Sequence, residues 1–270
     1  MPELPEVETI VRDVRPVLEG RRVVSVEVLK PDILKKRISR AAFIRGVTGR
    51  RIERVGRRAK NIVIELDSGF RIVIQPGMTG ALIIGGEPEY DVVVLGLSGR
   101  KVARYQDVRR LGRVYLLSPE QWARHSEAIG PEPLDRAFTP ATLLERLRGR
   151  KTAIKKALMD QRVLAGVGNI YASEALWMAG IDPSRPAAGV TPAEAARLHR
   201  AIVDVLRRSI RGRGTTFRDY RTGTGESGSF AARLAVYERG GEPCLRCGAP
   251  IAGTHAIDAR STYFCYRCQR

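Results

Sequence analysis

Apolar residues recur at helical spacing at the start of the chain. Between residues 3 and 19, the positions that carry this spacing are Leu4, Val7, Ile10, Val11, Val14 and Leu18. Separations of three and four residues put these side chains on one face of a helix, and Gly20 follows as a stop signal. The pattern predicts an amphipathic helix with one buried face.

Short β-branched runs replace the helical pattern over residues 21–117. The runs are VVSVEVL, RIERVGRRAKNIVIEL, FRIVIQPGM, YDVVVLGL and RVYLL. Two polar triplets between them, Asp67-Ser68-Gly69 and Ser98-Gly99-Arg100, are typical of hairpin turns. This half of the chain predicts a mostly antiparallel β-sandwich or barrel fronted by the one helix.

The pattern becomes helical again after a linker marked by Pro131, Pro133 and Pro140. The helical runs are ATLLERL, TAIKKALMD, NIYASEALWMAG and TPAEAARLHRAIVDVLRRSIR. Residues 212–229 are rich in Gly, Ser and Thr, which predicts a mobile loop or linker. We therefore expect a multidomain α+β protein: a β-sandwich domain over residues 1–130, a helical domain over 131–229 and a cysteine-rich β-hairpin over 230–270.

The charge of the chain indicates the class of its partner. Lys and Arg number 47 against 29 Asp and Glu, a net charge of +18, which favours a polyanion and above all nucleic acid. A merely basic composition is the alternative, while a membrane surface is disfavoured because no basic amphipathic helix carries an aromatic face. No apolar run approaches the roughly 18–20 residues of a membrane span. The acidic start MPELPEVETI is unlike a signal peptide, so we expect a soluble cytoplasmic protein.

All four cysteines lie near the end of the chain, in two Cys-x-x-Cys pairs. Cys244 and Cys247 form the first pair, and 17 residues separate it from Cys265 and Cys268. Four thiolates at this spacing predict tetrahedral ligation of one Zn²⁺, and because no ligand position is left open, the metal should be structural. Two disulfides or four free thiols are the alternatives. Zinc ribbons also occur in proteins without enzymatic activity, so this motif indicates nucleic-acid binding but no reaction.

Pro2 has a chemical use if Met1 is removed. A small second residue favours that removal, which would leave a secondary amine able to attack a sugar C1′ and form an iminium. An α-amino group has a pKa near 8, against about 10.4 for lysine, so more of it is uncharged at neutral pH. Glu3 is adjacent for proton transfer, and Glu6 lies one helical turn away. The alternative is ordinary helix chemistry, in which proline and glutamate simply favour the first turn.

The opening MPELPEVET resembles that of the formamidopyrimidine-DNA glycosylase family, and the similarity extends over essentially the whole chain. RRAK at 57–60, PGMTG at 76–80 and DVRRLGR at 107–113 resemble the family's strand lysine and its two loops that enter DNA. KTAIKKALMDQRVLAGVGNIYASEAL at 151–176 is similar to its helix–two-turn–helix, and the cysteine-rich tail to its zinc finger. The resemblance implies a bacterial base-excision-repair enzyme, both DNA glycosylase and AP lyase, that removes oxidised purines.

The resemblance also implies roles for single residues. Pro2 would be the nucleophile, Glu3 would transfer a proton, and Lys60 and Arg260 would assist elimination, while Glu6 and Thr216 would line the lesion pocket. The residues expected to contact DNA are Met78, Tyr90, Arg110, Leu111, Lys151, Lys155 and Asn169. Taken singly, these residues have plainer interpretations, such as a core methionine, a surface charge or a helix N-cap asparagine. The implied partner is damaged double-stranded DNA, bound by a monomer with one zinc ion at the bacterial nucleoid.

Several positions depart from the family pattern. Leu111 stands where an aromatic residue is usual, Gln75-Pro76 stands where His-Leu is common, and Tyr90 lies near a usual histidine; the cysteine spacing is also slightly longer. These changes affect the expected lesion preference more than the reaction class. The length of the loop at 217–229, which caps oxidised guanine in relatives, favours oxidised purines. Two rivals remain: a paralogue specialised for oxidised pyrimidines or hydantoins, and a non-catalytic DNA-damage-binding zinc protein.

Overall fold

A computed structural model describes residues 1–35, 38–216, 220–257 and 259–270. The chain forms two compact units, which we call unit 1 (Met1–Ala128 with Ile210–Ala231) and unit 2 (Ile129–Ser209 with Ala232–Arg270). The described parts of the predicted loop at 212–229 therefore belong to unit 1. Among the helices of the described ranges, none has the length and apolar character needed to cross a membrane.

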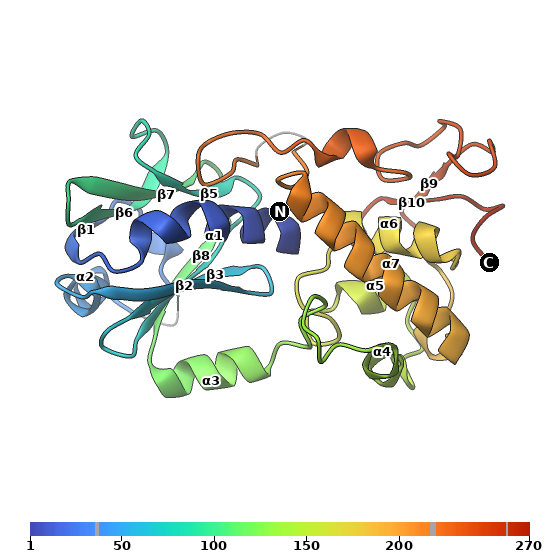
Figure 1. Ribbon diagram of the computed structural model, residues 1–270, viewed down its shortest axis with the longest axis horizontal. Helices are drawn as coiled ribbons and strands as arrows, with labels where there is room; N and C mark the ends of the chain where they lie inside the picture. Colours follow the sequence, from blue (N-terminus) through green and yellow to red (C-terminus); the bar gives the residue numbers. More distant parts are fainter. Residues whose placement is uncertain (36–37, 217–219, 258) are drawn as a thin grey trace. The chain divides into compact units, whose positions relative to one another are not determined.

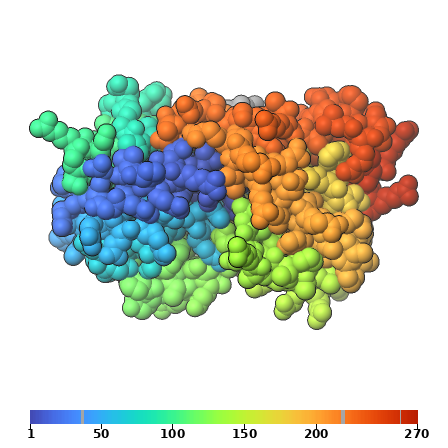
Figure 2. All heavy atoms as spheres, in the orientation of Figure 1, coloured from blue at the N-terminus to red at the C-terminus, as the bar shows by residue number. Residues whose placement is uncertain are grey.

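Unit 1 begins with helix α1 (Leu4–Leu18), as the apolar spacing predicts (Figure 1). The six apolar positions that predict this helix are all fully buried. The helix packs mainly on β2 and β5, which are edge strands of two different sheets. Its polar side remains at the surface, and the blue helix is visible along this face of the molecule (Figure 2). Because α1 closes one side of the sandwich, its position is fixed by both sheets.

Two antiparallel four-stranded sheets form the sandwich, which confirms the predicted fold class. The first sheet has the order β1 (Val23–Val28), β6 (Asp91–Leu97), β7 (Lys101–Asp107) and β5 (Gly80–Ile84). The second has the order β2 (Ile52–Arg58), β3 (Asn61–Leu66), β4 (Arg71–Gln75) and β8 (Arg113–Leu117). Their inner faces and α1 share one apolar core.

Both predicted hairpin turns are present, and the structure adds one that the sequence pattern did not indicate. Gly69 and Gly99 adopt left-handed φ angles of 80° and 75° between β3 and β4 and between β6 and β7. The run at 51–66 is two strands rather than one, because the chain reverses at Ala59-Lys60. The two central residues, Ala59 and Lys60, are not typical turn residues, so they gave no signal of a turn.

Unit 1 also contains helices that the sequence pattern did not predict. They are α2 (Arg40–Val47), α3 (Pro119–Glu127), the 3-10 helix η1 (Pro31–Ile33) and the first half of the 3-10 helix η3 (Phe230–Arg233). Helix α3 has no buried residue, and Trp122 is its only large apolar side chain, so no run of apolar residues indicated the helix. Its start is nevertheless specified locally, because Ser118 and Gln121 form a capping box.

Unit 2 is helical with a C-terminal β-hairpin, also as predicted. Its elements are α4 (Pro140–Leu147), α5 (Ile154–Met159), α6 (Asn169–Ala179), η2 (Ala187–Gly189), most of α7 (Pro192–Arg211), β9 (Ala252–Thr254) and β10 (Thr262–Phe264). The turn Leu164–Gly168 between α5 and α6 is almost entirely buried. Helix α6 ends at Gly180, whose φ of 70° is the left-handed conformation that terminates helices.

Candidate active site and zinc site

The start of α1 holds the residues of the expected N-terminal chemistry. Pro2 is buried behind Met1, which is 51% exposed. Glu3 is the N-cap of the helix, and its backbone N–H donates to Glu6 Oε2 at 2.9 Å, so the two glutamates form a capping box. Pro2 therefore precedes the helix instead of occupying its first position; the proline of the first turn is Pro5. The plain helix-start interpretation accounts for Pro5 and not for Pro2.

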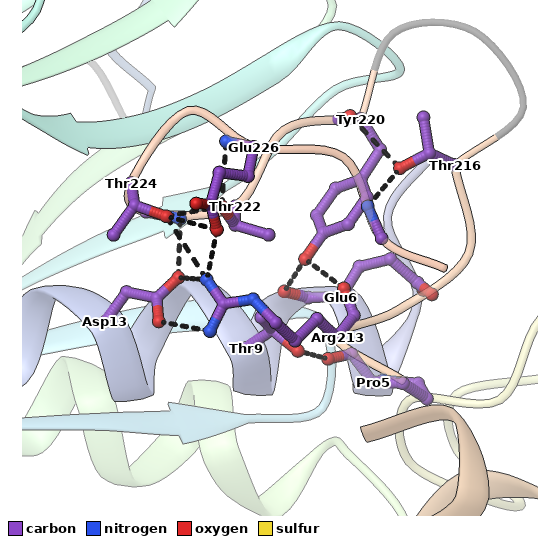
Figure 3. Close-up of polar contacts among 12 residues, drawn as sticks. Pro5, Glu6, Thr9, Asp13, Arg213, Thr216, Tyr220, Thr222, Thr224 and Glu226 are labelled. Atoms are coloured by element: carbon purple, nitrogen blue, oxygen red, sulfur yellow. Dashed lines mark hydrogen bonds and ion pairs between the residues drawn. The ribbon is translucent and has the colours of Figure 1, made fainter. Parts of the chain in front are cut away.

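Glu6 connects α1 to a segment more than 200 positions away. Its Oε1 accepts from the backbone N–H of Thr215 at 2.8 Å. Its carbonyl oxygen accepts from the Tyr220 hydroxyl at 3.2 Å (Figure 3). Burial raises the pKa of the Tyr220 hydroxyl, and the nearby charge of Glu6 raises it further, so it remains a proton donor. Thr216, expected beside Glu6, accepts from the Gly228 N–H at 2.8 Å. The residues 217–219 of the predicted capping loop lie outside the described part of the chain.

Lys60 lies in the two-residue turn between β2 and β3 and is only 6% exposed. The preceding residue, Ala59, has a φ of 53°, a left-handed conformation that costs a residue with a Cβ about 1–2 kcal/mol. Arg57 stabilises the turn, because its Nη1 donates to the Ala59 carbonyl at 2.9 Å. The Nε of Arg57 also donates to Glu8 of α1 at 3.1 Å. The lysine turn is thus tied to the helix that begins with the two glutamates.

The four loop residues expected to contact DNA in unit 1 are all at the surface. Met78, Tyr90 and Leu111 are exposed apolar side chains, and Arg110 makes an exposed ion pair of 3.4 Å with Asp32. Tyr90 and Arg110 both have positive φ angles, of 57° and 51°.

Asp107, which the sequence analysis did not single out, joins the two loops that carry Met78 and Leu111. This buried carboxylate accepts from the Thr79 hydroxyl at 2.5 Å and from the Gly112 N–H at 2.7 Å. The loops approach so closely that a Cβ on Gly77 would lie 2.6 Å from the Gly112 nitrogen. The DVRRLGR pattern contains Asp107, but only the fold reveals its partner across the sheet.

The residues expected to bind DNA in unit 2 divide between the surface and the interior. Lys151 is exposed, and so is Arg260. Lys155 is fully buried, and its ammonium donates to the Ser261 carbonyl at 3.0 Å and to Thr262 Oγ1 at 2.7 Å. Asn169 Nδ2 also donates to the Ser261 carbonyl, at 3.1 Å. Asn169 is the first helical residue of α6 and not its N-cap, which is Gly168. Lys155 and Asn169 thus hold the chain directly after Arg260.

The four cysteines have the arrangement that a tetrahedral metal site requires. Their sulfur atoms all lie within 4.8 Å of one another, with Cys244–Cys268 at 4.0 Å and Cys247–Cys265 at 3.5 Å. Zinc–sulfur bonds of about 2.3 Å in a tetrahedron separate the sulfurs by about 3.8 Å. None of the four is in a disulfide, so the alternative of two disulfides is wrong. The thiols fit one structural Zn²⁺, as predicted.

Trp177 of α6 packs against the zinc site. Its indole Nε1 donates to Cys244 Sγ at 3.4 Å, a contact that offsets the charge of a metal-bound thiolate. Arg246 stacks over the Trp177 ring at 4.4 Å and donates to the carbonyls of Trp177 and Met178. Its side chain therefore helps to cap the carbonyl groups at the C-terminal end of α6.

Glu174 is a second buried carboxylate that the sequence analysis missed. It accepts from the backbone N–H groups of Ala235, Val236 and Tyr237 at 2.8, 2.9 and 2.9 Å. Burial raises its pKa, and the three hydrogen bonds oppose that shift. A polar residue among apolar ones in NIYASEAL was the available signal. Glu174 anchors the chain where it enters the zinc module, the residues from Gly241 to Arg270.

Comparison with known proteins extends over the whole chain. The sequence model of the formamidopyrimidine-DNA glycosylase N-terminal domain matches residues 1–114, that of the family's H2TH domain matches 129–220, and a zinc finger found in FPG and IleRS matches 241–270. The formamidopyrimidine-DNA glycosylase of Chloroflexus aurantiacus is 42% identical over 100% of this chain and 98% of its own length. That of Desulforamulus reducens is 43% identical over 100% of this chain and 99% of its own.

Solved structures agree with the sequence comparison. The MutM (Fpg) protein of Thermus thermophilus has a TM-score of 0.89 at 38% identity, covering 99% of this chain and 98% of that one. A Lactococcus lactis FPG mutant in complex with Fapy-dG containing DNA has a TM-score of 0.91 at 30% identity, covering 100% of both chains. Together with the capped N-terminal helix and the four-cysteine site, these matches show that the chain belongs to the formamidopyrimidine-DNA glycosylase family.

Proposed function

We propose that this chain is a bifunctional DNA glycosylase and AP lyase that removes oxidised purines, 8-oxoguanine and formamidopyrimidines, from double-stranded DNA. The observation that carries the proposal is the start of α1, where Pro2 directly precedes the capped pair Glu3 and Glu6. The Lactococcus lactis protein of this family supports the proposed substrate class, because it forms complexes with DNA that contains Fapy-dG or an abasic site. The net charge of +18 suits a polyanionic substrate.

The proposed nucleophile is the Pro2 nitrogen after removal of Met1. The secondary amine attacks C1′ of the damaged nucleotide, the glycosidic bond breaks, and the base leaves with the bonding electron pair and a proton. The nitrogen loses its proton, and its lone pair then forms an iminium at C1′ while the ring C1′–O4′ bond breaks and O4′ takes up a proton. This cation acidifies the C2′ proton, so β-elimination breaks the 3′ C–O bond, and δ-elimination then breaks the 5′ C–O bond. The products flank a one-nucleotide gap.

Other residues of the proposed site assist these steps. Glu3 exchanges protons with the sugar or the leaving base, and Lys60 and Arg260 assist elimination and hold phosphate. Glu6 and Thr216 line the pocket for the damaged base. The position of Glu3 supports its role, because it is buried at the N-cap of α1, directly after Pro2.

The nucleotide has to leave the duplex before its C1′ is accessible. We propose that Met78 and Leu111 fill the resulting gap and that Arg110 pairs with the orphaned base; their exposure on two tied loops supports this role. Tyr90, Lys151 and the strand held by Lys155 and Asn169 contact the backbone. Zinc, when bound, shapes the hairpin that presents Arg260, and it takes no part in the chemistry. We further propose that the protein acts as a monomer in the bacterial cytoplasm, at the nucleoid.

Borohydride trapping tests the proposed chemistry. Met-processed protein is mixed with a duplex that carries one 8-oxoguanine opposite cytosine, and borohydride reduces any iminium to a stable protein–DNA adduct. We expect an adduct with the wild type and none with Pro2→Gly or with a chain that retains Met1, while all three bind the duplex. No adduct even on an abasic duplex would overturn the lyase mechanism and favour the non-catalytic DNA-damage binder.

A broader or shifted lesion spectrum is the second candidate function. It is favoured by the Lactococcus lactis relative, which also forms a complex with an oxidised pyrimidine containing DNA. Leu111 stacks less well than an aromatic side chain and so relaxes discrimination at the gap. Single-turnover excision rates on 8-oxoguanine, formamidopyrimidine, oxidised pyrimidine and hydantoin duplexes separate the two. Faster excision of pyrimidines or hydantoins than of purines would replace the first proposal with the second.

A further inference from the structure

Two flanks of one segment, residues 212–216 and 220–229, return from α7 and lie along α1 (Figure 3). At the N-terminal end of the helix, Thr215 and Tyr220 of this segment donate hydrogen bonds to Glu6 of α1. About two helical turns further along, the segment is held again by Asp13. The second attachment touches none of the residues proposed for the chemistry at the sugar.

Asp13 accepts three hydrogen bonds from the segment. Both of its oxygens accept from the Arg213 guanidinium, at 3.2 and 3.0 Å, and Oδ2 also accepts from the Gly223 N–H at 3.0 Å (Figure 3). The Asp13 side chain is only 10% exposed. A two-point contact between a guanidinium and a largely buried carboxylate fixes orientation as well as distance.

Arg213 connects the two flanks to each other as well as to the helix. Its Nη2 donates to Thr224 Oγ1 at 3.2 Å and lies 3.3 Å from Glu226 Oε2. Its own backbone has a φ of 58°, a conformation that favours glycine over arginine. The ion pair with Asp13 offsets that local cost, so the side chain and not the backbone preference accounts for arginine at this position.

The far flank approaches α1 too closely for a side chain. A Cβ on Gly223 would lie 2.6 Å from Asp13 Cβ and 2.9 Å from Val14 Cγ1. The Gly223 carbonyl in turn accepts from the Ile84 N–H of β5 at 3.3 Å. The segment is therefore seated on both α1 and the neighbouring sheet, with Asp13 at the centre of the contact.

We propose that Asp13 and Arg213 form a clamp that positions the wall of the base pocket, namely Thr215, Thr216 and Tyr220, against Glu6. The clamp then determines how well the damaged base is recognised and leaves the reaction at the sugar unaffected. This inference rests on the proposed function, in which Glu6 and Thr216 line the pocket. Asp13 and Arg213 are positioning residues, because they act on the base through the segment.

The test compares one duplex with a base in the pocket and one without. Single-turnover rates of adduct formation are measured on 8-oxoguanine and on an abasic site in the same sequence. We expect Arg213→Gln and Asp13→Asn to slow adduct formation on the 8-oxoguanine duplex about tenfold, or about 1.4 kcal/mol. On the abasic duplex, the same variants should slow it less than about twofold. Arg213→Lys keeps the charge but not the two-point contact and should recover part of the loss. The matched control is Arg12→Gln, which removes an exposed ion pair with Glu8 on the same helix.

Equal losses on both duplexes, or none on either, would overturn the clamp while leaving the proposed function intact. If the wild type forms no adduct on either duplex, the proposed chemistry is wrong, and equilibrium binding decides the clamp. In that case, Arg213→Gln should reduce the preference for the 8-oxoguanine duplex over the undamaged one, and Arg12→Gln should not. An unchanged preference would refute the clamp independently of catalysis.

Discussion

The zinc module and the start of α1 are two candidate sites built in opposite ways. All ligands of the zinc site lie between Cys244 and Cys268, and each pair is brought together by a single tight turn. The carboxylate of Glu6 at the start of α1 is instead held by Thr215, 209 positions away. The first site needs only local chain geometry and a metal, whereas the second needs the folded sandwich and a distant segment.

This difference determines how each site responds to a substitution or to the loss of the metal. A structural zinc site supplies folding free energy directly, so its removal should affect one module strongly and the rest weakly. The α1 site is embedded in a continuous apolar core, so single substitutions there should change geometry more than folding. The following predictions test that contrast.

Loss of the metal should have the largest effect. Structural zinc contributes an apparent 10–16 kcal/mol in isolated fingers, so Cys247→Ser should abolish zinc binding and unfold the zinc module. We expect DNA affinity to fall about 100-fold, because the hairpin that carries Arg260 is lost. Zinc content by atomic absorption and hydrogen exchange over residues 241–270 measure both effects.

The same experiment tests the independence of unit 1. Amide protection in β3 and β4 should be unchanged in Cys247→Ser, because these strands are paired within their own sheet. A zinc module that stays folded and protected without metal would contradict the structural role of zinc. Loss of amide protection in β3 would contradict the idea that unit 1 folds independently of the zinc module.

The sequence predicted the local features of both sites and missed the connections between distant elements. The cysteine spacing, the α1 periodicity and the Gly-containing turns each have a physical signal within a few residues. Asp107 and the Asp13–Arg213 pair have none, because a carboxylate reveals its partner only when the sheet or helix beside it is in place. Glu174 stands out as a polar residue among apolar ones, but that signal does not identify its partner. The Ala59-Lys60 reversal was missed for a related reason: Arg57 stabilises a turn whose two central residues are not the usual turn residues.

The tie between the lysine turn and α1 should have an intermediate effect. Arg57→Gln removes the donor to the Ala59 carbonyl and the ion pair with Glu8, which leaves Lys60 less well positioned. We expect strand cleavage on an abasic duplex to slow about tenfold, or about 1.4 kcal/mol, with little change in DNA affinity. Stopped assays of cleavage and anisotropy of a labelled duplex separate the two quantities.

Arg12→Gln is again the appropriate comparison, because Arg12 pairs with the other oxygen of Glu8 but is exposed. Exposed ion pairs contribute about 0–1 kcal/mol, so this variant should cleave at the wild-type rate. If both variants lose the same activity, then Glu8 itself, and not the lysine turn, is the feature that matters. If neither loses activity, the tie does not position Lys60.

The smallest effect is expected where α7 begins, next to the last residue of the zinc module. Glu194 forms a capping box with Thr191 and a two-point ion pair with Arg185, at 2.6 and 3.1 Å. Arg185 also donates to the Arg270 carbonyl at 3.0 Å, so this pair fixes the C-terminus of the zinc module without contacting the metal. We expect Glu194→Gln to lower the free energy of unfolding at neutral pH by about 1 kcal/mol.

The pH dependence distinguishes the ion pair from a simple packing change. Hydrogen bonding to Arg185 lowers the pKa of Glu194 to about 2, below its ordinary value, so its stabilisation is complete above the ordinary pKa and is lost as the pH falls toward 2. The difference in the free energy of unfolding between wild type and Glu194→Gln should therefore be the same at pH 7 and pH 5.5. It should shrink as the pH falls below about 4. Protonation of the zinc thiolates destabilises both proteins alike and cancels in the difference. A difference that persists unchanged into acid would mean that the Glu194 side chain stabilises the protein by its shape and not by its charge.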